Sequence, residues 1–123
     1  MTSVLIVDDD DQIRRSLSRL LTSNELQCRV ASALDDAAEA VRSDMPDVVL
    51  LDVTLGHTSG LGLLKELRQN DARRPGIVMM TGRRDLFPEI STTLGPADDW
   101  ITKPWDADEL IARLYLSARR ARL

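Results

Sequence analysis

The sequence predicts an α/β fold in which a doubly wound, five-stranded parallel sheet carries helices on both faces. Five short apolar runs alternate with segments whose apolar residues recur at helical spacing. The runs are rich in Val and Ile and mostly apolar on both sides, as in parallel strands that are covered on both faces. At 123 residues the chain can bury one core and leaves no room for a second domain of any size. We therefore expect a single domain over residues 1–123.

The predicted strands are short and are separated by helix-length segments. In chain order they are SVLIV (3–7), QCRVA (27–31), VVLLD (48–52), GIVMM (76–80) and DWIT (99–102). Regular alternation with helices implies right-handed crossovers and one parallel sheet. Met79 and Met80 lie inside an apolar run, so we assign them to the core rather than to a cofactor site.

The segments between the strands are amphipathic. One face is apolar in each of the first three segments, at Ile13, Leu17, Leu20 and Leu21, then Leu34, Ala37, Ala38 and Val41, then Leu61, Leu63, Leu64 and Leu67. In the first segment, residues 11–21, we expect the arginines to lie opposite that face. Each segment should therefore pack its apolar side on the sheet.

Two helix starts carry a capping pattern, in which a polar residue is followed by an acid three positions later. Ser32 with Asp35 precedes the second helix, and Asp106 with Glu109 precedes the last one. The segment DLFPEISTTLG, residues 85–95, is the weakest helix, because a proline must occupy its first turn and two β-branched threonines follow. We expect that helix to be short or mobile.

Composition and charge indicate an ordinary soluble protein. Hydrophobic residues make up 43% of the chain and charged residues 29%, and no apolar run approaches the roughly 20 residues that span a bilayer. The N-terminus becomes acidic too early for a signal peptide, and the single Cys28 cannot form an internal disulfide, so we expect a cytoplasmic location without membrane contact. A net charge of -4 argues against direct binding of nucleic acid. Three arginines near the C-terminus suit the last turn of a helix, where the helix dipole favours cations: Arg119, Arg120 and Arg122.

Polar side chains gather where four of the predicted strands end. Asp8 and Asp9 follow the first strand, Asp52 ends the third, Thr81 follows the fourth and Lys103 follows the fifth. In a doubly wound sheet ligands bind outside the carboxyl ends of the strands, so we expect these side chains to converge. Taken one at a time, each has an ordinary explanation as a helix cap, a turn residue or an exposed side chain. Their shared placement favours a single site.

The residue types suit a metal ion and a phosphoryl group. Clustered carboxylates raise one another's pKa unless a cation neutralises them, and Mg²⁺ prefers oxygen ligands. A carboxylate can also attack phosphorus and form an acyl phosphate, whose added charge needs the metal, a lysine and a hydroxyl nearby. Asp10 and Asp11 are expected only to cap the following helix and to complement its dipole.

Four motifs together resemble the receiver domain of bacterial two-component response regulators, over essentially the whole chain. They are VLIVDDD (4–10), VVLLDVTLGHTSGLGLL (48–64), VMMTG (78–82) and ADDWITKPW (97–105). The resemblance implies a flavodoxin-like fold with strand order 2-1-3-4-5. It also implies that Asp52 accepts a phosphoryl group from the phosphohistidine of a sensor histidine kinase or a histidine phosphotransfer protein.

By motif position, the resemblance assigns roles around a Mg²⁺ ion. Asp9 and Asp52 would bind the ion directly, together with the backbone carbonyl of Thr54. Asp8 would act through water, and Lys103 would contact the phosphoryl oxygens. We expect no enzymatic turnover beyond slow self-dephosphorylation.

The resemblance also implies a switch. Thr81 would move to hydrogen-bond the phosphoryl group. Trp100, at the family's aromatic switch position, would turn inward and rearrange the face made by the fourth helix, the fifth strand and the fifth helix. The alternative for Trp100 is an aromatic ring that fills a gap beneath the fourth helix. Thr54 and Arg83 flank the phosphoryl position, and Arg83 is expected to shield the acyl phosphate from water.

Parts of the sequence depart from the family pattern. Gly56 stands where a proline is customary, and Pro96 stands where a glycine usually precedes Ala-Asp-Asp. We expect a more flexible loop at Gly56 and an altered entry to the last strand at Pro96. His57 in the same loop is expected to be solvated rather than a metal ligand or a relay histidine. The Lys103–Pro104 peptide bond is expected to be cis.

The output stays open. No DNA-binding or enzymatic segment follows Leu123, which leaves a stand-alone regulator or a receiver cut from a longer protein. A phosphorylation-dependent homodimer also stays open, although Ser91 stands where the dimer contact usually has a basic residue. Two other classes remain. An aspartate-nucleophile phosphatase would need an Asp-x-Asp motif and a cap domain, and a flavodoxin-like cofactor binder would need a phosphate-cradling loop in place of DDDDQ.

Overall fold

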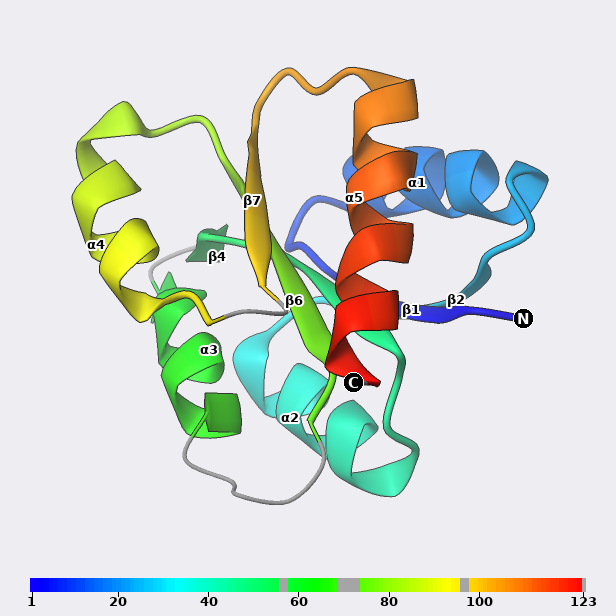
Figure 1. Cartoon of the computed structure of the whole chain (residues 1–123), viewed down its shortest axis with the longest axis horizontal. Coiled ribbons are helices and arrows are strands. Elements are labelled where there is room, and N and C mark those ends of the chain that lie inside the picture. Colours follow the sequence, from blue (N-terminus) through cyan, green and yellow to red (C-terminus); the bar gives the residue numbers. More distant parts are fainter. Residues whose placement is uncertain (56–57, 69–73, 96–97, 123) are drawn as a thin grey trace.

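The computed structural model describes residues 1–55, 58–68, 74–95 and 98–122, and these residues form one five-stranded parallel sheet with helices on both faces (Figure 1). The sheet strands are β1 (Ser3–Val7), β2 (Gln27–Ala31), β3 (Val48–Asp52), β6 (Gly76–Thr81) and β7 (Asp99–Thr102). The helices are α1 (Asp11–Ser23), α2 (Leu34–Ser43), α3 (Leu61–Arg68), α4 (Phe87–Thr93) and α5 (Ala107–Ala121). The strand order β2-β1-β3-β6-β7 confirms the predicted 2-1-3-4-5 topology.

Each face of the sheet has its own apolar core. On one face α2, α3 and α4 pack over strand residues that include Leu5 and Leu51. On the other face α1 and α5 pack over Ile6 and Leu50. Neighbouring residues of a strand point to opposite faces, which is why Leu50 and Leu51 belong to different cores. The central strands β1, β3 and β6 are buried almost throughout, as predicted for parallel strands.

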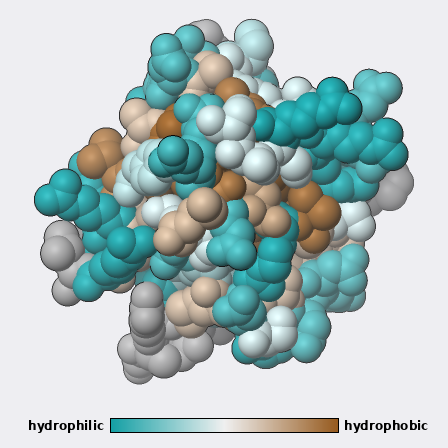
Figure 2. Space-filling model, turned by 90° about the vertical axis from the view of Figure 1, so that its right-hand side faces the viewer, coloured by the Kyte–Doolittle hydropathy of each residue, from teal (hydrophilic) through white to brown (hydrophobic). Residues whose placement is uncertain are grey.

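The edge strand β2 differs from the prediction. Val30 is 51% exposed, and Gln27 also faces solvent. The expectation that every strand is covered on both faces is therefore wrong for β2, because an edge strand is paired on one side only and the helices cover it incompletely. Figure 2 views the side on which α1 and β2 lie and shows mostly hydrophilic side chains with small, separate apolar patches.

Two helix starts are capped as predicted and one is not. Asp10 and Asp106 accept hydrogen bonds from backbone N–H groups in the first turns of α1 and α5. The expected cap at Ser32 is wrong, because α2 begins at Leu34 and its N-cap is Ala33, which makes no side-chain cap bond. The negative charges of Asp35 and Asp36 in the first turn of α2 interact favourably with the helix dipole instead.

Helix α4 is short, as predicted. It has seven residues, Pro88 lies in its first turn, and a single 3-10 turn, η1 (Arg84–Leu86), precedes it. Among the described residues no helix is both long and apolar enough to cross a membrane. The predictions made for Gly56, His57 and Pro96 fall outside the described residues.

A two-stranded hairpin that the sequence did not predict follows β3. Its strands β4 (Thr54–Leu55) and β5 (Thr58–Ser59) pair in antiparallel fashion. The N–H of Gly60 then donates to the carbonyl of Val53 at 2.6 Å. A Cβ atom built on Gly60 would lie 2.2 Å from the carbonyl oxygen of Asp52. The hairpin therefore returns the chain into direct contact with the backbone of Asp52.

Candidate functional site

The loop between β1 and α1 places two acids at the carboxyl edge of the sheet. The side chain of Asp8 is buried, and Asp9 is exposed. Oδ1 of Asp8 accepts a hydrogen bond from the N–H of Asp10 at 2.9 Å. The backbone carbonyl of Asp8 accepts one from Nη1 of Arg14 at 2.8 Å. The start of α1 therefore holds both the carboxylate and the backbone of Asp8.

Asp52 ends β3, and its side chain is almost completely buried. Oδ1 of Asp52 accepts from the N–H of Thr54 at 3.0 Å, and Oδ2 accepts from Nζ of Lys103 at 3.1 Å. The N–H of Lys103 donates to the carbonyl of Thr81 at 2.8 Å, which continues the pairing of β6 with β7. Parallel pairing thus brings the lysine from the last sheet strand to the aspartate of the central strand.

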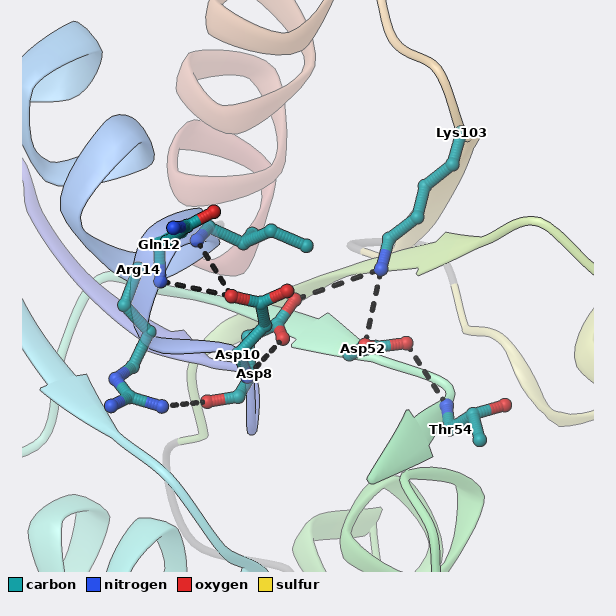
Figure 3. A network of polar contacts seen from close by, with 8 residues as sticks. Asp8, Asp10, Gln12, Arg14, Asp52, Thr54 and Lys103 are labelled. Atoms are coloured by element: carbon teal, nitrogen blue, oxygen red, sulfur yellow. Dashed lines mark hydrogen bonds and ion pairs between the residues drawn. The ribbon is translucent and has the colours of Figure 1, made fainter. Parts of the chain in front are cut away.

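Asp8, Asp9 and Asp52 form one acidic cluster beside Lys103. One carboxylate oxygen from each acid lies within 4.8 Å of the others. Figure 3 shows the side chain of Lys103 reaching toward both Asp8 and Asp52, with its ammonium 3.7 Å from Oδ2 of Asp8. That oxygen is buried and, within the part of the chain that the structure describes, has no hydrogen-bond partner. A hard divalent cation with retained waters would satisfy it, so the donor set fits Mg²⁺.

The surroundings of Asp8 act on its pKa in opposite directions. Burial raises the pKa of Asp8 above its ordinary value of 3.8, and the charge of Asp52 raises it further, while the N–H of Asp10 and the charge of Lys103 lower it. The net direction is upward. In the metal-free protein the ionised carboxylate of Asp8 is therefore less favourable in the folded state than in the unfolded chain.

Replacing Asp8 with asparagine should raise the Tm of the metal-free protein at neutral pH, because the amide keeps the shape of the side chain and removes a buried charge. Since the pKa of Asp8 is higher in the folded state, its ionised carboxylate lowers the stability of the fold at pH values above the folded pKa. This loss of stability is relieved as the pH falls through the folded pKa and Asp8 takes up a proton. The gain in Tm should therefore shrink at acidic pH. Thermal unfolding of both proteins in EDTA over a pH series measures this difference. A lower Tm for Asp8→Asn at neutral pH would contradict the expectation.

Thr81 ends β6 and is buried beside β7. Its hydroxyl oxygen accepts from the N–H of Arg83 at 2.9 Å and lies 3.3 Å from the carbonyl of Arg83, to which it donates. The hydroxyl is thus bonded within its own loop. The side chain of Arg83 is exposed and pairs with Asp85, with Nη2 at 2.6 Å from Oδ2. The hydrogen bond from Arg83 lowers the pKa of Asp85, which agrees with a charged pair.

Trp100 on β7 is half-buried beside α4. Its ring centroid lies 4.3 Å from that of Phe87, the first residue of α4, and the ring planes are tilted by 50°. A cavity of about 150 Å³ borders both the acid site and α4, and its lining residues are Thr81, Gly82, Phe87, Thr102, Lys103 and Pro104. The Lys103–Pro104 peptide bond is cis, as predicted. The same cavity therefore reaches from Thr81 to Phe87, the ring of the aromatic pair that lines it.

Reasoning from the sequence missed three residues that shape this site. Arg14 was expected on the outer face of α1, yet its side chain is 16% exposed, against 73% for Arg15. Its place one helical turn after the cap at Asp10 could have indicated contact with the acidic loop. Gly60 and Phe87 could not be singled out, because their roles depend on how the hairpin and α4 approach the sheet.

The chain is similar to known proteins over nearly its whole length. Residues 4–115 match the family model described as the response regulator receiver domain. The transcriptional regulatory protein DltR of Streptococcus agalactiae is 34% identical over 120 residues, which cover 98% of this chain and 53% of that protein. The transcriptional regulatory protein KdpE of Mycobacterium tuberculosis is 37% identical over 120 residues, which cover 98% of this chain and 52% of that protein. The crystal structure of the receiver domain of NtrX from Brucella abortus has a TM-score of 0.82 at 29% identity, and the match covers 94% of this chain and 98% of that one. The chain spans about half the length of DltR and KdpE.

Proposed function

Since the chain belongs to the family of response regulator receiver domains, we propose that Asp52 accepts a phosphoryl group and that the charge it gains switches the domain. The family is one of signalling domains that work with sensor kinases and output domains. The observation that carries the proposal is the buried carboxylate of Asp52, held by the ammonium of Lys103 on one oxygen and by the N–H of Thr54 on the other. Family membership favours this function over a phosphatase or a flavin binder.

In the proposed reaction a carboxylate oxygen of Asp52 attacks the phosphorus of a phosphohistidine on a sensor histidine kinase or a histidine phosphotransfer protein. A P–O bond forms, the P–N bond breaks, and the departing imidazole nitrogen takes up a proton. The ammonium of Lys103, 3.1 Å from Oδ2, would balance charge on the phosphoryl oxygens. The domain itself would add only slow hydrolysis of its own acyl phosphate.

The acidic cluster would hold Mg²⁺ for this reaction. Asp9 and Asp52 would bind the ion directly with the backbone carbonyl of Thr54, and Asp8 would act through water. When bound, Mg²⁺ compensates the negative charge that gathers on the transferring phosphoryl group. Two observations support this assignment: the buried Oδ2 of Asp8 has no hydrogen-bond partner among the described residues, and the three carboxylates converge.

Phosphorylation adds about one and a half to two negative charges, which would draw Thr81 and Lys103 toward Asp52. Thr81 must first give up the hydrogen bonds that its hydroxyl makes with the backbone of Arg83. The two arrangements of Thr81 are therefore alternatives, as a switch between two states requires.

Trp100 would turn inward when Thr81 moves, and the face made by α4, β7 and α5 would change with it. The half-buried ring and the cavity that reaches from Thr81 to α4 support this motion. In a Trp105→Phe background the remaining indole fluorescence should change when Mg²⁺ and beryllofluoride are added. A spectrum without change would count against the inward turn.

Thr54 and Arg83 are proposed to set the lifetime of the acyl phosphate. The guanidinium of Arg83 is paired with Asp85, so it must leave this partner before it can shield the phosphoryl group from water. Arg83→Ala should therefore shorten the lifetime, and Asp85→Asn should lengthen it. Decay of the phosphorylated proteins after removal of the donor measures both. Equal lifetimes in the two variants and the wild type would remove Arg83 from the proposal.

The output partner is a further proposal. DltR and KdpE are transcriptional regulatory proteins about twice as long as this chain, so we infer that this receiver, residues 1–123, controls an output domain or a separate partner. We expect the receiver to bind neither nucleic acid nor membrane directly. A cytoplasmic location and a phosphorylation-dependent homodimer stay predictions.

Incubation with acetyl phosphate and MgCl₂, followed by mass spectrometry of the intact protein, tests the proposed function. The wild type should gain the mass of one phosphoryl group, and EDTA should prevent the gain. Asp52→Asn should gain nothing, whereas Asp36→Asn, which changes an exposed acid on α2, should behave as the wild type. An adduct on Asp52→Asn, or none on the wild type with acetyl phosphate or a phosphohistidine donor, would reject the function.

A further inference from the structure

We propose that Arg14 is a positioning residue for the metal site, because its guanidinium fixes the Asp8–Asp9 peptide so that both carboxylates face Asp52. The inference rests on the proposed Mg²⁺ site and deepens it. Arg14 lies next to the acidic cluster of Asp8, Asp9 and Asp52. It is neither a proposed metal ligand nor part of the proposed phosphoryl site.

The contacts of Arg14 form a clamp between α1 and the acidic loop. Nη1 donates to the backbone carbonyl of Asp8 at 2.8 Å, and Nη2 donates to Oδ1 of Asp11 at 3.1 Å (Figure 3 shows the first of these). The side chain is 16% exposed, so the guanidinium is largely withdrawn from water. A planar guanidinium with two neighbouring acceptors has little freedom to rotate.

The carbonyl that Arg14 holds belongs to the peptide joining the two acids. Asp8 on one side is buried, and Asp9 on the other is exposed. The N–H of Asp8 donates to the carbonyl of Ala31 at 3.2 Å, and Oδ1 of Asp8 accepts from the N–H of Asp10. Fixing the intervening carbonyl sets the direction in which the chain leaves Asp8, and hence the direction of the Asp9 side chain.

A role in orienting the ligands and a purely electrostatic role predict opposite changes in Mg²⁺ affinity when Arg14 is removed. A positive charge near the cluster repels a divalent cation, so charge alone predicts that removing Arg14 tightens the binding of Mg²⁺. If the main role is to orient the ligands, removing it weakens binding, because supporting groups around a metal site typically contribute a factor of about ten or more in affinity. The sign of the change therefore separates the two roles.

Arg15 provides a matched control for charge. Its Nη2 lies 3.0 Å from Oδ2 of Asp11, so it shares the acidic partner of Arg14, but its side chain is 73% exposed. Arg14→Met and Arg15→Met lose the same charge from neighbouring positions of α1, and each loses one ion pair with Asp11. Of the two, the Arg14 variant also loses the hydrogen bond to the carbonyl of Asp8.

Titration of each purified variant with MgCl₂ by isothermal calorimetry tests the inference. Arg14→Met should bind Mg²⁺ about tenfold more weakly than the wild type, and Arg15→Met should stay within about twofold. Arg14→Lys, which keeps the charge and can donate to the carbonyl of Asp8 but lacks the planar guanidinium, should recover part of the loss. Thermal unfolding in EDTA shows whether Arg14→Met is folded before titration. If it is not, the comparison of Arg14→Lys with Arg15→Lys replaces it, with weaker binding expected for the former.

Binding by Arg14→Met that equals or exceeds wild-type binding would overturn the inference, as would an equal loss in both methionine variants. A wild type that binds no Mg²⁺ would overturn the metal site and the inference together. A wild type that binds Mg²⁺ with the expected loss in Arg14→Met, yet gains no phosphoryl group, would support the inference and reject the proposed function.

Discussion

Replacing Lys103 with methionine is expected to slow the proposed phosphoryl acceptance by Asp52 about a hundredfold, because a cation aimed at developing negative charge typically contributes that much. Nζ of Lys103 lies 3.1 Å from Oδ2 of Asp52 and 3.7 Å from Oδ2 of Asp8. Methionine keeps the unbranched, flexible shape of the side chain, is one atom shorter, and loses the charge. The rate at which the phosphoryl adduct appears with acetyl phosphate at saturating Mg²⁺ measures the effect.

The same substitution should lower the free energy of unfolding of the metal-free protein by about 2 kcal/mol, because Asp8 and Asp52 lose their shared counter-charge. The loss stays below that of a wholly buried pair because the side chain of Lys103 is 26% exposed. Urea unfolding in EDTA measures it, and MgCl₂ should restore most of the stability. Lys65→Met is the control, since Nζ of Lys65 makes a surface pair with Glu89 at 3.9 Å. Equal effects of the two substitutions would contradict the prediction.

Replacing Gly60 with alanine should destabilise the protein by about 2–3 kcal/mol, as overpacking of a tight site does. The new Cβ would lie 2.2 Å from the carbonyl oxygen of Asp52, and backbone atoms cannot yield as a flexible side chain can. The hairpin would have to move away from β3, which would weaken the hydrogen bond from Gly60 to Val53. Urea unfolding measures the loss, and the Mg²⁺ affinity should fall with it because Asp52 shifts.

Gly62 offers the matched control for that change. It lies in α3, is exposed, and an added Cβ there would meet nothing within 4 Å. Gly62→Ala should therefore stabilise the protein by about 0.5–1 kcal/mol, since alanine loses less backbone freedom in a helix. If Gly60→Ala were as stable as Gly62→Ala, the close approach of the hairpin to Asp52 would not be a real constraint.

The sheet could be predicted from the sequence because its central strands are apolar runs bounded by helical segments. Four of the five predicted strand ranges agree with the structure to the residue, and the fourth extends to Thr81. The hairpin after β3 could not be predicted, because two-residue strands have no periodicity to detect. The cap at Ser32 failed by one position, since the helix it was meant to start has Ala33 as its N-cap.

The convergence of the acids and the lysine could also be anticipated, because parallel strands that pair in register end at one edge of the sheet. The hydrogen-bond and ion-pair partners of the individual side chains could not be anticipated. Thr81 bonds to the backbone of Arg83, Arg83 pairs with Asp85, and Arg14 turns back to the acidic loop. These contacts depend on rotamers and loop paths, which residue spacing leaves unspecified.

The contact between the rings of Phe87 and Trp100 means that the indole cannot leave its place without uncovering part of the phenyl ring. Bare aromatic surface is unfavourable in water, so the first turn of α4 should follow the indole. A small apolar molecule bound in the space that the indole leaves would cover the ring of Phe87 and would then oppose the movement of α4. It would oppose the proposed change in the face made by α4, β7 and α5 without blocking the proposed phosphoryl transfer to Asp52.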